Sequence, residues 1–414
     1  MENKIKAHIE DPEGLERLYR ENKYEFRKAF NHIAAASTSD LIRFWKIRLA
    51  AENDVPSTGF LKLDVWVIVL LSLVTAFLAK LPAFFPAIDP EFFYPRNLAI
   101  VVFNSLMLFA FWQNRSYSAR KLLFYGGVIL GLTLFLNLLP GKESDSIELA
   151  FIHAPLLLWC LFGLVFVSFD FKNMAKRIDF IRFNGELVIM TGLILIAGGI
   201  LTALTIGLFT AIEINVEEFY FEYVVVLGSV AAPIVAFYLI CIYPNLTNKI
   251  APVIARVFTP LVLITLSVYL VSLVFSGANI RDDRELLLLI NIMLVAILAL
   301  IVFSVSELDK TKAKNVHVFI LFLLAALAIV VNAIALTGIL SRLANGFTPN
   351  RTVVLVSNVL IFANLILMAK NLFRAYFHGH PLQAVEHTIA RYLTIYAAWT
   401  VVVIFILPFV FGLN

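Results

Sequence analysis

Long apolar runs, separated by short charged or turn-forming segments, leave this sequence few possible folds. Eleven runs approach or exceed the length of about 20 residues that an α-helix needs to cross a hydrocarbon layer of roughly 30 Å. They cover residues 62–84, 96–113, 121–140, 148–169, 186–212, 219–243, 257–276, 285–306, 315–340, 352–370 and 389–412. With 61% hydrophobic and 15% charged residues, the chain has more apolar surface than a soluble core can bury. We predict an all-α, polytopic transmembrane helix bundle of about 11 transmembrane helices.

The first part of the chain differs from the rest. Residues 1–60 are polar and charged and lack the apolar stretch of a signal peptide. Apolar residues recur there at helical spacing in "DPEGLERLYRENKYEFRKAF" and "STSDLIRFWKIRLAAE", which predicts a small cytoplasmic helical hairpin before a transmembrane domain at 61–414. This hairpin can dock a cytoplasmic protein partner, or lie through its basic face on the anionic inner leaflet.

Lys and Arg alternate in abundance from one inter-run segment to the next. They are frequent before the first run and in every second segment after it, and sparse in the others. Because positive residues stay on the cytoplasmic side, we predict a bacterial inner-membrane protein with a cytoplasmic N-terminus and an outer C-terminus. We therefore attribute the net charge of +4 to topology, and predict the lipid bilayer as partner and no nucleic acid.

The stretch "GFTPNR" at 346–351 predicts a tight outer turn. Pro349 pushes Thr348 toward an extended conformation, and Gly346 is a suitable end for the preceding helix. Asn350 is expected to cap the next helix, leaving Arg351 in a first turn where the helix dipole disfavours a cation.

We therefore expect Arg351 to have an acidic partner, either in the cluster at 281–285 or among Glu217, Glu218 and Glu222. The alternative is solvated loop charges, since exposed ion pairs contribute little. The residues of this predicted outer ion-pair network are Asp283, Arg284, Arg342, Asn350 and Arg351.

Polar residues inside apolar runs are the other candidates, because burying them in lipid is costly. The predicted polar path consists of His153, Glu218, Glu222, Asn291, Asn332 and Lys80. Each has a simpler reading: Lys80 can snorkel to the surface, and His153 can be hydrogen-bonded structure. Glu218 and Glu222 can be ordinary outer-leaflet charges beside aromatic anchors, and the asparagines can join helices.

Common enzyme motifs are absent from the sequence, including Walker A, HExxH, CxxC and GxSxG. The segment "YFHGHPLQAVEH" brings His378 and His380 together with Glu386 and His387, which makes the first two weak candidates for metal ligands. We predict no metal site and no cofactor.

Several segments resemble a known family. They are "LGSVAAPIVAFYLI", "RVFTPLVLITLSVYLVSLVF", "RDDRELLLLINIMLVAILALIVFSVSE" and "SRLANGFTPNR", within residues 190–370. The chain resembles there an uncharacterised bacterial family of multi-pass membrane proteins catalogued as a domain of unknown function. The most specific likeness is to that family's glycine-threonine-x-asparagine-arginine turn, matched by Arg342, Gly346, Thr348, Pro349, Asn350 and Arg351. The resemblance implies a polytopic membrane fold, no known activity and no assigned site residues.

Three classes of function are compatible with these patterns. A transporter or channel for a small solute or ion uses the polar path, and this is the class we favour. A membrane scaffold or sensor docks partners through residues 1–60. A membrane-embedded enzyme needs clustered titratable groups, for which the histidine segment is the only candidate.

Overall fold

The computed structural model describes residues 5, 7–8, 11–21, 26, 30, 40–54, 62–114, 118–141, 144–211, 215–276, 284–308, 315–344 and 346–413. These residues form helices and turns, and no strand occurs among them. The chain divides into two compact units, Met1–Val67 and Ile68–Asn414.

The first unit has its own aromatic core. Helices α2 (Pro12–Glu21) and α4 (Asp40–Asp54) contribute most of its buried residues. Trp45 lies at 1% exposure against the rings of Tyr19 and Phe26, and Arg48 covers the Trp45 ring at 4.6 Å while pairing with Glu16 at 2.7 Å. The two predicted amphipathic segments thus contain helices, and of the rest of the predicted hairpin the structure describes only residues 5, 7–8, 11, 26 and 30.

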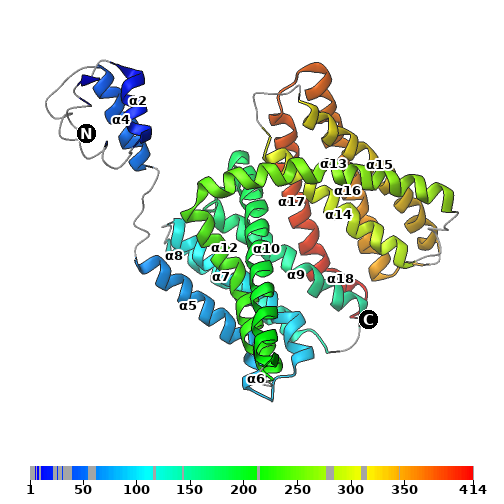
Figure 1. Ribbon diagram of the computed structural model, residues 1–414. Helices are drawn as coiled ribbons and strands as arrows, with labels where there is room; N and C mark the ends of the chain where they lie inside the picture. Colours follow the sequence, from blue (N-terminus) through cyan, green and yellow to red (C-terminus); the bar gives the residue numbers. More distant parts are fainter. Residues whose placement is uncertain are drawn as a thin grey trace. The chain divides into compact units, whose positions relative to one another are not determined.

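The second unit is built from long helices joined by short connections (Figure 1). In chain order its helices, short ones included, are α5 (Lys62–Ala79, of which residues 62–67 belong to the first unit), α6 (Leu81–Phe84), α7 (Pro90–Asn114), α8 (Ala119–Leu138), α9 (Asp145–Phe166), α10 (Met174–Ala211), α11 (Glu217–Phe219), the π-helix η1 (Tyr220–Val225), α12 (Val226–Ile242), α13 (Pro244–Ser276), α14 (Arg284–Ser306), α15 (Val316–Leu343), α16 (Pro349–His378), α17 (Gln383–Phe405) and α18 (Leu407–Val410).

Ten helices of the described chain are long and apolar enough to cross a membrane. They correspond to the predicted runs from 96–113 onward, so the predicted fold class is confirmed and the chain is a multi-pass integral membrane protein. The first predicted run, 62–84, differs: its apolar helix Asp64–Ala79 is shorter and stops at Lys80, before α6. Pro82 explains the interruption, because proline has no N–H to donate to the preceding turn and crowds it.

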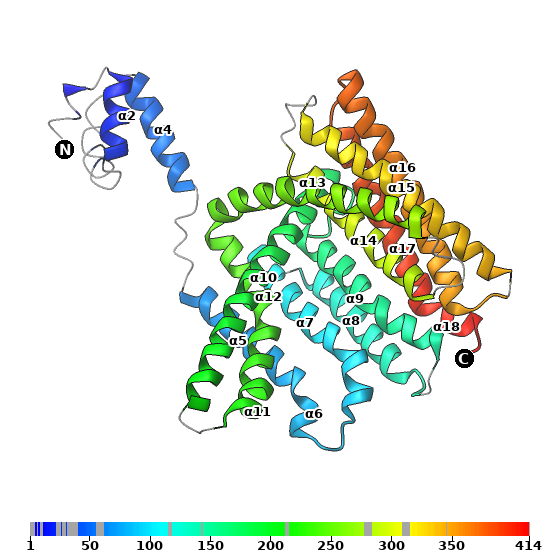
Figure 2. The same cartoon turned by 45° about the vertical axis from the view of Figure 1, so that its right-hand side comes forward.

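The helices of the second unit pack in two connected groups. In the first, α7 packs on α9 and α10 packs on α12; in the second, α14, α15 and α16 pack on one another and α13 packs on α15. Helix α17 contacts both α9 and α16 and joins the groups. Two views show α13 running crosswise to α10 (Figures 1 and 2).

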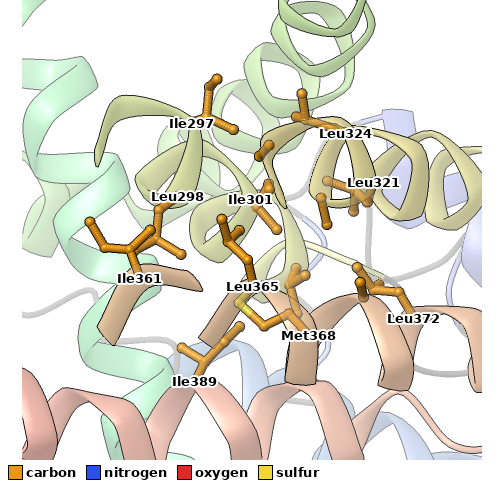
Figure 3. Packing of buried hydrophobic residues seen from close by; sticks show 14 of the residues in the cluster. Ile297, Leu298, Ile301, Leu321, Leu324, Ile361, Leu365, Met368, Leu372 and Ile389 are labelled. Carbon is orange, nitrogen blue, oxygen red and sulfur yellow. The ribbon is translucent and has the colours of Figure 1, made fainter. Parts of the chain in front are cut away.

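The largest buried cluster lies in the second group. Side chains of α14, α15, α16 and α17 meet there, with Ile301, Leu365 and Met368 fully buried at its centre (Figure 3). Because lipid tails are as apolar as these side chains, close packing is what favours helix association here. Ala328 and Ala335, both fully buried on α15, keep that helix surface small enough for close approach.

The predicted turn between α15 and α16 is observed, with one correction. Gly346 has φ 109°, which favours glycine, and Thr348 is extended at φ −121° and ψ 158°. Thr348 Oγ1 accepts from the Arg351 N–H at 3.3 Å, so Thr348 caps α16. The predicted cap at Asn350 is wrong, because Pro349 takes the first helical position and shifts the cap to the residue before it.

Candidate functional site

Three asparagines lie at a similar depth in neighbouring helices of the second group. Asn291, Asn332 and Asn358 are 7, 11 and 9 residues from the ends of α14, α15 and α16 that lie on one side of the bundle. At 1.5 Å per residue this places them about 10–17 Å from those ends, well inside the span. We call these three residues the open asparagine cluster.

Hydrogen bonds join the members of the open asparagine cluster. Asn358 Nδ2 donates to Asn291 Oδ1 at 2.9 Å and to the carbonyl of Val354 at 2.8 Å. Asn332 Nδ2 donates to the main-chain carbonyl of Asn358 at 3.2 Å. The cluster therefore connects α14 to α16 and α15 to α16.

Two amide oxygens of this cluster accept no hydrogen bond from any residue that the structure describes. They are Oδ1 of Asn332 and Oδ1 of Asn358, whose side chains belong to residues only 0% and 2% exposed. The orientation of each amide is set by its neighbours: each Nδ2 faces a main-chain carbonyl, which can only accept, so each oxygen must point the other way. The cluster thus keeps two free acceptors in an apolar interior.

A third buried amide lies further along α16. Asn364 Nδ2 donates to Tyr396 Oη at 2.9 Å, and Asn364 Oδ1 is without a donor among the described residues. The tyrosine hydroxyl can both donate and accept, so either orientation of this amide satisfies the contact. Unlike Asn332 and Asn358, Asn364 therefore does not have its oxygen fixed as a free acceptor.

A second pair of asparagines, between α7 and α8, has no such free oxygen. Asn97 Nδ2 donates to Asn137 Oδ1 at 3.0 Å, and Asn137 Nδ2 donates to Asn97 Oδ1 at 2.9 Å. The remaining amide protons reach the carbonyls of Phe93 at 3.2 Å and Thr133 at 2.8 Å. We call Asn97 and Asn137 the closed asparagine pair.

Lys80 and Glu222, two residues of the predicted polar path, form an ion pair. Lys80 Nζ lies 3.1 Å from Glu222 Oε1, and 4.8 Å from the ring centre of Tyr223. The Lys80 side chain is 6% exposed, so it is buried and paired and does not snorkel. Both residues occupy irregular helix segments: Lys80 follows the end of α5, and Glu222 lies in the π-helix η1.

The other members of the predicted path lie apart from this ion pair. His153 contacts the carbonyl of Leu149 at 2.8 Å through Nδ1, within its own helix, and Glu218 is exposed. No hydrogen bond or ion pair between described residues links Lys80 and Glu222 to the open asparagine cluster. The predicted path is thus two separate polar groups and two single residues.

The residues of the predicted outer network have the following positions. Arg351 Nη1 donates to the carbonyl of Gly346 at 2.9 Å, within the turn itself. Arg342 lies in the last turn of α15 and Asn350 in the first turn of α16. Asp283 lies outside the described residues, and Arg284 begins α14 with a side chain that is not described. Of the acidic candidates, Glu222 pairs with Lys80.

The histidine segment shows no ligand cluster. His378 and His380 are exposed, and His378 ends α16 beside the ring of Phe373. Nowhere in the described ranges do three His, Cys, Asp or Glu side chains gather as a metal site requires.

Arg96 and Glu186 are among the buried charged residues that the sequence did not indicate. Arg96, 5% exposed, lies between the rings of Phe92 at 3.8 Å and Phe151 at 4.5 Å and donates to two main-chain carbonyls. Glu186, 7% exposed, lines a cavity of about 10 Å³, enough for roughly one water molecule. Both residues stand at the first position of a predicted run, whereas α7 and α10 begin 6 and 12 residues earlier. Pro95 and Gly185 stand directly before them and are typical of helix ends, yet α7 and α10 continue through both positions.

An ion pair and a hydrogen bond join α10 to the end of α14. Arg182 Nε lies 3.2 Å from Glu307 Oε1 and also donates to the carbonyl of Ser306 at 3.2 Å. Burial raises the pKa of the Glu307 carboxyl above its ordinary value, and the charge of Arg182 opposes that rise.

Comparisons with protein-family models, with curated proteins and with solved structures find no match to this chain.

Proposed function

We propose that this protein handles a small ion or polar solute within the membrane, in the manner of a transporter or channel, and that the open asparagine cluster is its binding site. The observation that carries the proposal is the pair of buried, undonated oxygens on Asn332 and Asn358. A buried acceptor without a donor costs about 1–3 kcal/mol, so a ligand that supplies the missing partner is stabilised there.

Helix association alone accounts less well for these residues. An asparagine that serves only to join helices gains most when both its donor and its acceptor are used, as in the closed asparagine pair. The open asparagine cluster uses its donors for helix contacts and leaves acceptors over. A binding site between helices needs this arrangement, in which amide nitrogens hold the structure together and amide oxygens stay free for a ligand.

Flux through reconstituted protein tests the proposal. The purified full-length chain is placed in liposomes, and the entry of labelled sodium, labelled rubidium and a small neutral solute such as glycerol is followed. We expect at least one of them to enter faster than in empty liposomes. In the Asn332→Leu variant this protein-dependent rate of entry is expected to be about tenfold lower. Asn137→Leu, the matched control in the closed asparagine pair, is expected to keep it. Equal entry with and without protein, or equal loss in both variants, would reject the proposal.

A scaffold or sensor that docks a cytoplasmic protein is the second candidate. It is supported by the separate aromatic core of the first unit, around Trp45 and Phe26. Removal of residues 1–54 separates the two candidates, because a transport site in the second unit keeps its flux without them. A non-transporting scaffold instead predicts no flux from either the full chain or the shortened one.

We also propose the orientation that the basic segments indicate, with the N-terminus cytoplasmic in a bacterial inner membrane, and membership of the uncharacterised family that residues 190–370 resemble. Single cysteines at two exposed loop positions, Gly141 and Asp170, test the orientation in a variant lacking Cys160 and Cys241. With the first run, 62–84, crossing as well, this orientation requires an impermeant thiol reagent added outside to label position 141 and spare position 170. The reverse pattern would overturn it.

A further inference from the structure

We propose that the ligand of the open asparagine cluster is a dehydrated monovalent cation, held by neutral oxygens that include Oδ1 of Asn332 and Oδ1 of Asn358. This inference rests on the proposed function, because it names the class of solute that the same site takes. It follows from the sign, the number and the surroundings of the free polar atoms.

The negative partial charge of the free oxygen atoms means that their ligand must be a cation or a hydrogen-bond donor. Both orphaned atoms of the cluster are amide oxygens, which accept hydrogen bonds or coordinate cations and repel anions. Asn358 uses both of its amide protons, on Asn291 Oδ1 and on the carbonyl of Val354, and Asn332 uses one of its two on the carbonyl of Asn358. These two residues therefore leave at most one proton for an anion, against two free oxygens for a cation.

The scarcity of carboxylates on the helices around the cluster favours a cation with a single charge. Helices α13, α15 and α16 contain no Asp or Glu over 244–276, 316–343 and 349–378, and the one carboxylate of α14, Glu285, stands at the start of that helix, six residues before Asn291. Magnesium and calcium sites depend on carboxylate ligands to offset two charges, whereas neutral carbonyl oxygens suffice for an alkali cation, as in potassium-selective filters.

The surroundings favour dehydration. Next to the asparagines on the same helices lie Ile290 at 2%, Val331 at 1% and Ile361 at 6% exposure. Attraction between an ion and a carbonyl dipole is stronger in such apolar surroundings than in water. The two residues with free oxygens are in direct contact, because Asn332 Nδ2 on α15 donates to the main-chain carbonyl of Asn358 on α16.

Thermal stability of the full-length protein in detergent tests this inference without any transport. The midpoint of unfolding is compared in sodium chloride, potassium chloride and N-methyl-D-glucamine chloride at equal ionic strength. Because a ligand that binds only the folded state raises the midpoint, we expect sodium or potassium to raise it by about 3 °C at saturation, and the organic cation, too large for the site, to have no effect. Magnesium at matched ionic strength is expected to add nothing.

Variants assign the effect to the site. Asn332→Leu is expected to need about tenfold more cation for the same shift, and Asn137→Leu to respond as the wild type does. Equal midpoints of the wild type in all salts would overturn the inference, even if a variant failed to fold. An equal shift in wild type and Asn332→Leu would also overturn it, because the ion would then act elsewhere.

The two proposals fail separately. A saturable cation shift that depends on Asn332, without flux in liposomes, supports the cation site and removes the transport function. Flux of glycerol that depends on Asn332, without any cation shift, overturns the cation site and leaves the transport function in place.

Discussion

Two groups of asparagines in the same membrane unit use their amides in opposite ways. In the closed asparagine pair between α7 and α8, both oxygens of Asn97 and Asn137 accept and both nitrogens donate. In the open asparagine cluster of α14–α16, the nitrogens of Asn332 and Asn358 donate while their oxygens are left over. The same residue type thus joins helices in one place and keeps acceptors free in the other.

The difference extends to other, half-buried amides of the first helix group. Asn104 Oδ1 accepts from the hydroxyl of Tyr125, and Asn184 Oδ1 accepts from Trp159 Nε1 at 2.8 Å. Because each of these oxygens has an aromatic donor, the group formed by α7–α10 gains helix contacts from its asparagines. The lesson is that an intramembrane asparagine indicates function only when its hydrogen-bonding capacity is left incomplete.

Breaking the ion pair between Lys80 and Glu222 is expected to have the largest effect. Glu222→Gln leaves Lys80, buried at 6% side-chain exposure, without its counter-charge. We expect a loss of about 2 kcal/mol in the free energy of unfolding, below the range for fully buried pairs because Glu222 is 44% exposed. Equilibrium unfolding in detergent measures it, and Lys80→Met with Glu222→Gln is expected to recover most of the loss. A double variant less stable than the single one would contradict this account.

Breaking the closed asparagine pair comes next. Asn137→Leu removes two interhelical hydrogen bonds and leaves the Asn97 amide without its partner, so we expect a loss of about 1 kcal/mol. Replacing both residues with leucine removes the stranded amide and is expected to restore part of the stability. Additive losses in the double-mutant cycle would show that the two amides do not act together.

The corresponding change in the open asparagine cluster is expected to cost less. Asn332→Leu removes one donated bond and, with it, a buried oxygen that has no donor among the described residues. These two effects oppose each other, so we expect a change within about 0.5 kcal/mol when sodium and potassium are absent. The same unfolding measurement decides: a loss as large as that of Asn137→Leu would mean that the oxygen is satisfied after all.

The smallest effect concerns pH at the α10–α14 contact. Burial raises the pKa of Glu307 above its ordinary 4.5, so the fold favours its protonated form. Its contribution to stability is therefore complete below pH 4.5 and is lost as pH rises through the raised pKa. Glu307→Gln stays neutral, so we expect its stability to fall less than that of the wild type over this window, by about 0.5 kcal/mol, since Arg182 is 34% exposed. Parallel pH profiles for the two proteins would argue against this assignment.

Hydrophobic run length was sufficient to predict the fold class and ten of the spanning helices, because a bilayer imposes the same length on every span. Run length was less reliable at helix ends. Arg96 and Glu186 were placed at the ends of runs, although α7 and α10 continue through them and bury both. Hydropathy locates the apolar part of a helix and cannot show where its polar extension stops.

The candidate site was foreseen only by residue type. The sequence singled out Asn291 and Asn332, but Asn358 holds the cluster together, since it donates to one and its carbonyl accepts from the other. The pairing of Lys80 with Glu222 joins residues 142 positions apart, which no local pattern encodes. Which amide oxygens lack a donor depends on how helices dock, so it had to come from the structure.

Infrared spectroscopy of the asparagine carbonyls shows directly whether Oδ1 of Asn332 lacks a donor. Asparagine side chains are labelled with carbon-13, and the spectrum of Asn332→Leu is subtracted from that of the wild type in N-methyl-D-glucamine chloride and again in sodium chloride. An amide oxygen without a donor absorbs at a higher frequency than a hydrogen-bonded one. We expect Asn332 to give a high-frequency band in N-methyl-D-glucamine chloride, and this band to move to lower frequency in sodium chloride. A band at the hydrogen-bonded frequency in both salts would contradict it, because the oxygen of Asn332 would then be as closed as those of Asn97 and Asn137.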